Sequence, residues 1–270
     1  MARDGHCRPF DHNASGTIPG SGVAVVLLKP LTSAIKDQDN ILGVISGYAT
    51  NNDGDRKTGY TAPSLIGQSE CVVNAHRMAN ISPKDIDYIE CHGTATRLGD
   101  PIEVQALKEA FDHQRSDSDV LSTTHLGAIK ANIGHTDAAS GTVGVIKIVQ
   151  MLQHQVMPGQ ANYSKANSEL NLPDTCFEIS PQNTPWEPTK AKHRVAGVSS
   201  FGIGGTNAHV VIEDFAAQPK TNTEKSDESR SEQTAPKIIP ISAKSRSSLE
   251  SYRASLLNYV ENNIDKPGLT

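Results

Sequence analysis

Apolar runs alternate with helical patterns over the first 215 residues of the chain. The run GVAVVLLK, which begins at Gly22, predicts a buried strand, and residues 41–48 (ILGVISGY) predict a second one. Residues 63–79 follow with the pattern of a helix. Strands that alternate with helices in this way are typical of an α/β protein with a parallel or mixed sheet.

Two further apolar strands are each followed by a loop that contains a histidine. Residues 88–91 predict a short strand before His92, and residues 126–129 predict another before a polar loop that ends at His135. Sites in α/β sheets lie beyond the carboxyl ends of the strands. Two such loops in one chain therefore indicate a site more strongly than either loop alone.

The composition changes after Phe215. Residues 216–236 lack large apolar side chains and predict a flexible polar linker. From Lys237 we expect a short strand and then a helix. That helix would carry an apolar face made of Leu249, Tyr252, Leu256, Leu257 and Val260. We thus expect one folded segment over residues 1–215, the linker, and over residues 237–270 the truncated start of a further region.

Charge and composition exclude several classes of protein. The 270 residues carry a net charge of -5 with a pI near 6.0, so nucleic acid and anionic membranes are not expected partners. The longest apolar run is far too short to span a bilayer, and the N-terminus lacks the apolar core of a signal peptide, which predicts a cytoplasmic protein. Four isolated cysteines and the lack of an HExxH motif predict neither disulfides nor a metal site.

The first candidate motif is HGTATRLGDPIE, which runs from His92 to Glu103. A neutral imidazole at a strand end can donate to a developing oxyanion, and the hydroxyls of Thr94 and Thr96 can bind a polar ligand arm. Taken alone, however, one histidine is more often a structural or surface residue. Asp100 and Glu103 have the spacing of a capping box, so we expect them to cap a helix rather than to act in catalysis.

The second motif, AIKANIGH, places Lys130, Asn132 and His135 in the other loop. Taken alone, a lysine such as Lys130 is more often a surface charge than a site residue. The helix that follows contains Gly141 and Gly144. Because a glycine costs about 1 kcal/mol inside a helix, this pair predicts a close approach to another backbone.

The third motif, AGVSSFGIGGTNAHVVIED over residues 196–214, predicts two apolar strands joined by a glycine turn. Its glycines match neither the phosphate-binding loop GxxxxGKS/T nor a GxGxxG turn followed by a helix, so nucleotide binding is weakly supported. Glycines permit a tight turn and expose amide N–H groups. Such N–H groups can line an oxyanion hole.

Taken together and in this order, HGTATRLGDPIE, IKANIGHTDAASG and GVSSFGIGGTNAHVVIED resemble the ketosynthase domains of modular polyketide synthases and related fatty-acid synthases. The resemblance extends from GHCRPFDHNASGTIPGSGVAVVLLK, through YATNNDGDRKTGYTAPS, to about Glu213. The later PISAKSRSSLESYRASLL looks like the segment that follows such domains. The resemblance implies the C-terminal part of a thiolase-like αβαβα layered fold, with a mixed sheet and flanking helices.

The resemblance also implies a reaction, the decarboxylative Claisen condensation of an acyl thioester with a malonyl-type thioester on a carrier protein. His92 and His135 match the two histidines that hydrogen-bond the extender thioester oxygen and favour the enolate. Lys130 matches a lysine of a charged network near the second histidine. Thr94 and Thr96 match positions that contact the carrier's phosphopantetheine arm, which carries the substrates, so that no cofactor binds the chain directly.

The chain departs from the family pattern in three places. Ile203 stands in the glycine turn where the family often has a phenylalanine gate, and its backbone N–H is expected to serve an oxyanion hole. Cys91 stands where alanine is commoner, and it is not expected to be the nucleophile because neighbouring strand-end side chains point apart. The family's nucleophilic cysteine lies in an Ala-Cys-Ser-Ser type motif, which occurs nowhere in the sequence. It is expected to come from a missing N-terminal half of the domain.

Several interpretations stay open at this point. The leading hypothesis is a fragment, or a separately encoded half, of an elongating ketosynthase that is silent in condensation when alone. A thiolase-like acyltransferase is a second enzymatic hypothesis, which the pair of histidines disfavours. A catalytically silent scaffold, remnant or partner subunit is the non-enzymatic alternative. The expected partners are an acyl carrier protein, the N-terminal half and, in the complete domain, a second copy.

Overall fold

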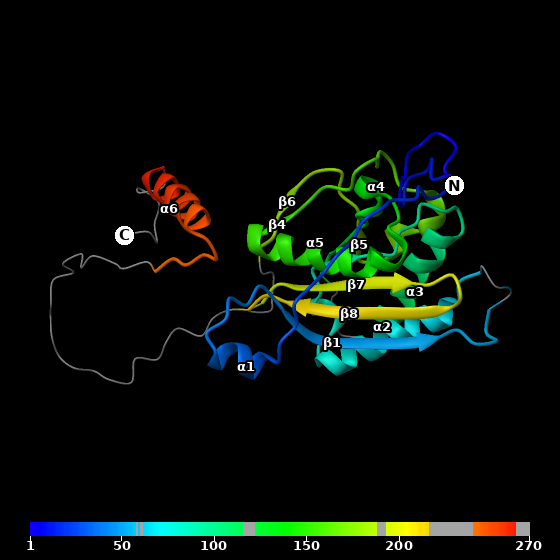
Figure 1. Ribbon diagram of the computed structural model, residues 1–270. Helices are drawn as coiled ribbons and strands as arrows, with labels where there is room; N and C mark the ends of the chain where they lie inside the picture. Colours follow the sequence, from blue (N-terminus) through cyan, green and yellow to red (C-terminus); the bar gives the residue numbers. More distant parts are fainter. Residues whose placement is uncertain (58, 60–61, 116–121, 188–192, 216–239, 263–270) are drawn as a thin grey trace. The chain divides into compact units, whose positions relative to one another are not determined.

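The computed structural model describes residues 1–57, 59, 62–115, 122–187, 193–215 and 240–262 (Figure 1). The chain divides into two compact units, Met1–Ala217 and Gln218–Thr270, and each is described by itself. The linker predicted over residues 216–236 lies outside the described residues. All three candidate motifs lie in the first unit.

A six-stranded mixed sheet forms the centre of the first unit. Its strands run in the order β1 (Val44–Asn52), β8 (Thr206–Glu213), β7 (Val195–Phe201), β2 (Tyr88–Glu90), β3 (Thr124–Gly127) and β5 (Phe177–Glu178). The first three strands are antiparallel neighbours, and β7, β2, β3 and β5 are parallel to one another. The predicted hairpin is confirmed as β7 and β8, and the strand predicted over residues 41–48 is confirmed as β1.

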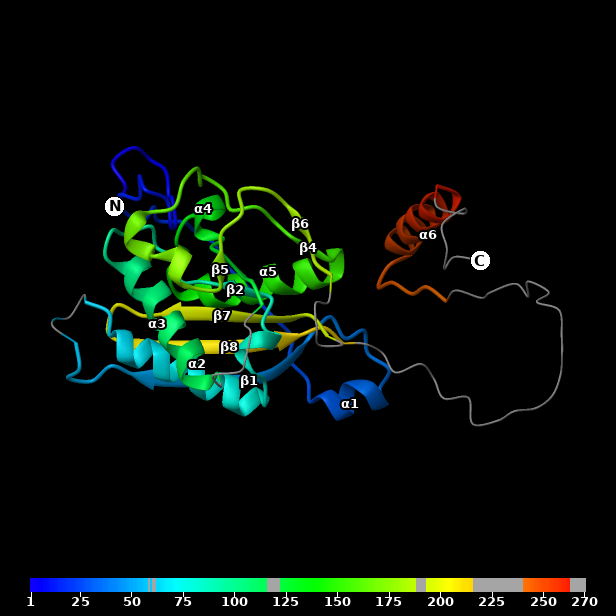
Figure 2. The same cartoon turned by 180° about the vertical axis from the view of Figure 1, so that it is seen from behind.

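Helices cover both faces of this sheet. The helices α2 (Leu65–Ala79) and α3 (Gly99–Gln114) lie on one face, and α5 (Ser140–His154) lies on the other (Figures 1 and 2). Successive side chains of a strand point to opposite faces. Ile89 of β2 thus packs into the cluster under α2 and α3, whereas Tyr88 packs into the cluster under α5. This arrangement confirms the expected layered α/β fold.

Short elements complete the first unit. They are α1 (Leu31–Lys36), α4 (Lys130–Ile133), the 3-10 turns Pro83–Asp85, Asp137–Ala139, Ser168–Leu170 and Leu172–Asp174, and the small sheet of β4 (Val156–Met157) and β6 (Thr184–Pro185).

The glycines of α5 let it approach the sheet closely. A Cβ atom on Gly144 would lie 2.9 Å from Cγ1 of Val198 on β7, and one on Gly141 would lie 3.4 Å from the side chain of Ser200. The two glycines thus make room for side chains of the sheet, whereas the prediction was a close approach to another backbone. This packing brings the start of α5, just beyond His135, against the middle of the sheet.

The strand predicted at GVAVVLLK is not formed. Residues 22–28 have no regular secondary structure, and the side chains of Val23 and Leu27 are 95% and 96% exposed. A strand needs a neighbour that pairs with its N–H and C=O groups. None of the strands in the described part of the chain lies against this segment. The pattern is that of a buried strand, but the described residues offer it no partner.

The second unit contains one described helix, α6 (Arg246–Glu261). The hydroxyl of Ser245 accepts a hydrogen bond from the amide of Ser248 and so caps this helix. No residue of α6 is buried among the described residues. Residues 240–243, part of the predicted strand, have no regular structure, because no described strand adjoins them, and residues 237–239 lie outside the described residues. Among the described helices, none is both long and apolar enough to cross a membrane.

Candidate active site

The carboxyl ends of β2 and β3 bring the two histidine loops together. The strands are parallel neighbours with Glu90 opposite Gly127, so the loops that follow them leave the sheet at the same edge. The ring centroids of His92 and His135 lie 5.3 Å apart, and the ring planes make an angle of 82°. Residues 43 positions apart in the sequence thus form one site.

Backbone amides determine which ring nitrogen of each histidine carries a proton. The amide of Asp137 donates to Nδ1 of His135 at 3.1 Å, and the amide of Phe201 donates to Nδ1 of His92 at 3.4 Å. A neutral imidazole that accepts a hydrogen bond at Nδ1 carries its hydrogen on Nε2. Both histidines are therefore arranged as Nε2–H donors.

The surroundings also keep both rings neutral. Burial lowers the pKa of His92 well below its ordinary value, and the positive charge of Lys130 and the neighbouring His135 lower it further. The pKa of His135 is lowered for the same two main reasons, burial first and then the charge of Lys130. At neutral pH, each ring is a neutral donor rather than an imidazolium ion.

The interpretation of Asp100 and Glu103 as a capping box is wrong. Glu103 accepts hydrogen bonds from the amides of His92 at 2.6 Å and Gly93 at 2.8 Å. Asp100 accepts from the amide of Phe10 at 2.8 Å and from that of Ala95 at 3.0 Å. Both carboxyl groups are buried. Their oxygens accept hydrogen bonds from the loop that contains His92 and from Phe10, and neither caps the start of α3.

Burial also changes how these two carboxyl groups titrate. Desolvation raises the pKa of Asp100 to about 7 and that of Glu103 to about 7, against the opposing effect of the amides that donate to them. Asp100 and Glu103 thus support the loop that contains His92. Another residue caps the start of α3. The hydroxyl of Thr96 accepts from the amide of Gly99 at 3.1 Å, which satisfies one free amide at the N-terminus of α3.

The hydroxyls of Thr94 and Thr96 are neighbours on the same loop, 3.2 Å apart. Both residues are partly exposed, so the loop presents two hydroxyl groups beside His92. Ile203 lies in the turn between β7 and β8 and is 65% exposed. No hydrogen bond or ring contact in the described residues links it to either histidine. The residue of this hairpin that reaches His92 is Phe201, through its amide and through its ring.

The structure buries Lys130, so the interpretation of an isolated lysine as a surface charge does not apply to it. Its residue is 4% exposed at the start of α4. Desolvation lowers the pKa of Lys130, whereas the charges of Glu90 and Glu103 oppose that shift. Within the described residues no hydrogen bond engages its ammonium group. A cation next to two neutral histidines attracts a negative charge that develops between them.

The sequence interpretation missed Glu90. This residue is 2% exposed on β2, two positions before His92, and it accepts a hydrogen bond from the amide of Ile129 in the other loop at 2.6 Å. A charged residue in an otherwise apolar strand was the signal that could have revealed it, because buried carboxylates are rare without partners.

None of the nearby cysteines has the character of a nucleophile. Cys91 is buried, and desolvation followed by the charge of Glu103 raises the pKa of its thiol well above the ordinary value. Cys7 is also buried, and desolvation raises the pKa of its thiol. A thiol with a raised pKa contains little thiolate at neutral pH. This agrees with the expectation that Cys91 does not attack a substrate.

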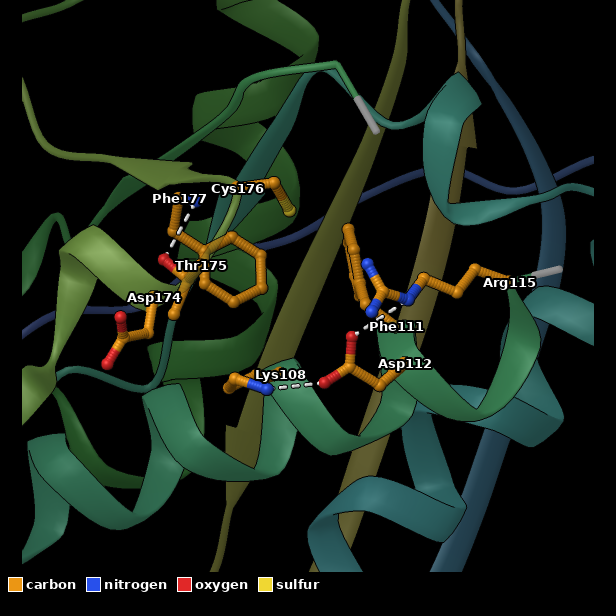
Figure 3. Close-up of a pocket in the computed structure, with 8 residues that line it drawn as sticks. All are labelled: Lys108, Phe111, Asp112, Arg115, Asp174, Thr175, Cys176 and Phe177. Atoms are coloured by element: carbon orange, nitrogen blue, oxygen red, sulfur yellow. Dashed lines mark hydrogen bonds and ion pairs between the residues drawn. The ribbon is translucent and has the colours of Figure 1, made fainter. Parts of the chain in front are cut away.

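A hollow of about 310 Å³ lies elsewhere in the first unit (Figure 3). It is lined by the C-terminal part of α3 and by the residues just before β5, at the amino ends of the parallel strands and thus away from the histidines. Its cations are engaged, because Lys108 and Arg115 both pair with Asp112. The described residues contain no cluster of three or more histidine, cysteine or acidic side chains that could hold a metal ion.

Comparison with protein-family models gives three matches along the chain. Residues 42–164 match the β-ketoacyl synthase C-terminal domain, and residues 167–267 match the ketoacyl-synthetase C-terminal extension. Residues 1–34 match part of the β-ketoacyl synthase N-terminal domain. The first match contains both histidines and Lys130.

Related proteins cover nearly the whole chain. A phenolphthiocerol/phthiocerol polyketide synthase protein of Mycobacterium tuberculosis is 42% identical over 95% of the chain, which spans 17% of that protein. Polyketide synthase PksN of Bacillus subtilis is 37% identical over 96% of the chain, which spans 5% of it. The solved ketosynthase from module 6 of the Bacillus subtilis bacillaene synthase superposes with a TM-score of 0.80 at 34% identity, over 97% of this chain and 43% of that one.

Proposed function

Because this chain belongs to the β-ketoacyl synthase family and corresponds to the C-terminal part of a polyketide-type ketosynthase, we propose that it supplies the histidines of a decarboxylative condensation. The observation that carries this proposal is the arrangement of His92 and His135. Both rings accept a backbone amide at Nδ1, both have a lowered pKa, and both therefore offer a neutral Nε2–H. Two donors that converge on one oxygen stabilise an enolate.

The proposed reaction begins with a malonyl-type thioester on a carrier protein. The bond between its α-carbon and its carboxylate breaks, carbon dioxide leaves, and the electron pair stays on the α-carbon as an enolate. His92 and His135 donate hydrogen bonds to the enolate oxygen, which is more negative than the starting carbonyl. The α-carbon then attacks the carbonyl of an acyl thioester, the carbon–sulfur bond breaks, and a cysteine thiolate is released.

Four further residues are assigned to this reaction. Buried Lys130 supplies positive charge beside the two rings. The hydroxyls of Thr94 and Thr96, which stand on the same loop as His92, contact the phosphopantetheine arm of the carrier protein. The amide of Ile203 is assigned to the oxyanion hole for the acyl thioester. The exposed position of Ile203 in the β7–β8 turn supports this assignment.

The cysteine of the reaction is proposed to come from an N-terminal ketosynthase domain. The exposed run at residues 22–28 supports this partner, since an apolar segment with the pattern of a buried strand stands uncovered. Tyr48 on the edge strand β1 is also 56% exposed. Residues 1–34 match part of the N-terminal domain model, which supports the same partner. In the complete domain a second copy is expected to join as a homodimer.

Co-production tests this proposal. The 270-residue chain would be produced together with the N-terminal domain of the bacillaene module 6 ketosynthase. The copurified complex would be supplied with an acyl thioester and malonyl-carrier protein, and carbon dioxide release and ketoacyl product would be assayed. The proposal predicts product from the complex and none from the chain alone. A complex that forms without product, and behaves like its His92→Ala variant, would contradict the function. Product from the chain alone would contradict the assignment of the cysteine to a partner.

A further inference from the structure

A buried polar cluster lies beneath the two histidine loops, on the side of the sheet that α5 covers. Tyr88 and Glu90 point to this side from β2, and Lys147 reaches them from α5. The ammonium of Lys147 donates to Oε2 of Glu90 at 2.6 Å and to the hydroxyl of Tyr88 at 2.7 Å. The Tyr88 hydroxyl in turn donates to Oε2 of Glu90 at 3.2 Å. All three residues are therefore joined to one another.

Two glycines make room for this cluster. A Cβ atom on Gly127 would lie 2.0 Å from the hydroxyl of Tyr88, a distance that no real contact allows. A Cβ atom on Gly144 would lie 3.3 Å from Cγ of Glu90 and closer still to Val198. The packing around the cluster therefore depends on the absence of side chains on β3 and α5. This arrangement differs from that of an incidental surface ion pair.

The second oxygen of Glu90 reaches across to the other loop. Its Oε1 accepts the amide of Ile129 at 2.6 Å, immediately before Lys130 and α4. The preceding amide, that of Ala128, donates to the side chain of Gln160 at 2.7 Å. Glu90 also lies two residues before His92 on its own strand. One carboxylate thus connects the strand that leads to His92 with the segment that leads to Lys130 and His135.

Charge supports the same picture. Glu90 is the foremost of the charges that raise the pKa of Lys130 against the effect of burial. Glu103 acts on Lys130 in the same direction, and Lys130 itself lowers the pKa of Asp100, His92 and His135. Buried ion pairs cost desolvation and often add little stability. A cluster of this kind is better explained by the geometry that it imposes.

We propose that Glu90 is a positioning residue of this site. The carboxylate of Glu90 is held by Lys147 and Tyr88. It fixes the segment after β3 against the strand that leads to His92, and so sets the geometry between the two histidines. The effect on condensation rests on the proposed function, whereas the effect on loop geometry does not.

Three variants test this role: Glu90→Gln, Lys147→Met and the two combined. In the copurified complex, Glu90→Gln is expected to lower kcat about 10-fold to 100-fold, as partners that orient catalytic groups usually do, with KM for the carrier substrate changed less than about threefold. Lys147→Met is expected to lower stability and kcat, because it leaves Glu90 buried without a counter-charge. The double variant should regain the stability but not kcat. A purely structural role predicts that both recover together.

Lys108→Met is the matched control. It removes a partly exposed lysine that pairs with Asp112 on α3 (Figure 3). Its kcat should equal that of the unmodified complex. If Glu90→Gln lies within twofold of this control, the inference is wrong.

A second readout needs no activity. In the chain alone, the amide proton of Ile129 should resonate far downfield because of its short bond to a carboxylate, and Glu90→Gln should shift it upfield together with the ring signals of His92 and His135. Unchanged ring signals would overturn the inference. If these signals move while the unmodified complex produces no ketoacyl product, the positioning role stands and the proposed function fails. If the unmodified complex produces ketoacyl product and Glu90→Gln does not change kcat, the proposed function stands and the positioning role fails.

Discussion

The chain itself provides hydrogen-bond partners for the loops around the histidines, but its described residues do not bury the apolar side chains of residues 22–28. Around the histidines, Glu90, Asp100 and Glu103 each accept hydrogen bonds from loop amides, and both rings have backbone donors. At residues 22–28, the side chains of Val23 and Leu27 are almost fully exposed. The difference teaches that contacts within the chain hold the histidine pair, whereas the described residues leave this apolar segment uncovered. Under the proposed function, a partner covers the segment.

The largest expected effect comes from a charge placed in the bare segment. Leu27→Asp should abolish copurification with the N-terminal domain, because a carboxylate would have to be buried without a partner. The stability of the chain alone should not change, since Leu27 is 96% exposed. Pull-down and thermal unfolding measure the two quantities.

Met78→Asp is the control for this change, because Met78 is an exposed residue of α2 on another face. It should copurify normally. If Leu27→Asp copurifies with the N-terminal domain as well as Met78→Asp does, the segment at residues 22–28 is not where the partner binds.

The next effect concerns the site itself. His92→Ala in the copurified complex should lower the rate of decarboxylation about 100-fold to 1000-fold, which is the usual cost of one oxyanion donor. Assembly should be retained, because the loop amides are held by Glu103, and the stability cost should be about 1 kcal/mol, because only the amide of Phe201 loses its acceptor. Carbon dioxide release under single-turnover conditions measures the rate. A loss below tenfold would show that the ring does not stabilise the enolate.

A smaller effect tests whether His76 and His209 are buried in a fixed core beside the sheet. His76 and His209 are buried against each other, and neither Nε2 has a hydrogen-bond partner among the described residues. Burial lowers the pKa of His76 to about 4. As pH falls below the ordinary value near 6.5, the unfolded chain binds a proton that the folded chain refuses, so stability is lost until the pH reaches about 4.

The variant His76→Leu isolates this contribution. Asp100 and Glu103 act in the opposite direction over part of the same range, because their pKa values are raised, but their effect cancels in the difference between the two proteins. Urea unfolding at pH 7 and pH 4 should show that His76→Leu retains roughly 2–3 kcal/mol more stability at the lower pH than the unmodified chain does. An equal loss in both proteins would mean that His76 is not buried in a fixed core.

The smallest effect separates two roles of Thr96. Thr96→Ala should cost about 1 kcal/mol of stability, because the amide of Gly99 loses its cap. If the hydroxyl also contacts the phosphopantetheine arm, KM for the carrier substrate should rise a few-fold. Thr94→Ala removes the neighbouring hydroxyl without removing a cap, and should change KM alone. If KM does not change in either variant, the assignment of these hydroxyls to the arm is wrong.

Much of the first unit could be predicted from the sequence, because its elements have continuous local patterns. The helix over residues 63–79, the strand β1 and the β7–β8 hairpin follow from apolar periodicity and turn residues. The short helix at Pro83 follows from its capping residues, and the side chain of Asp85 does accept the amide of Ser82, at 2.9 Å. These features depend on neighbours only a few residues away.

The capping box expected at Asp100 and Glu103 shows where such prediction stops. The spacing is correct for a cap, but the amides that these carboxyl groups accept belong to Phe10, Ala95, His92 and Gly93, which the fold brings to them. Burial of Lys130 is likewise a tertiary property. The histidine pair was predictable because two parallel strands end at the same sheet edge, whereas the bond from Glu90 to Ile129 depends on strand register.

The central claim is that His92 and His135 are neutral Nε2–H donors held side by side. Two-dimensional ¹H–¹⁵N spectra of the imidazole rings in the purified chain at pH 7 test it most directly, since they report the protonation of each ring nitrogen. The account predicts an unprotonated Nδ1 and a protonated Nε2 in both rings. Protonation of Nδ1 in either ring at neutral pH, as the other tautomer or as an imidazolium ion, would contradict it.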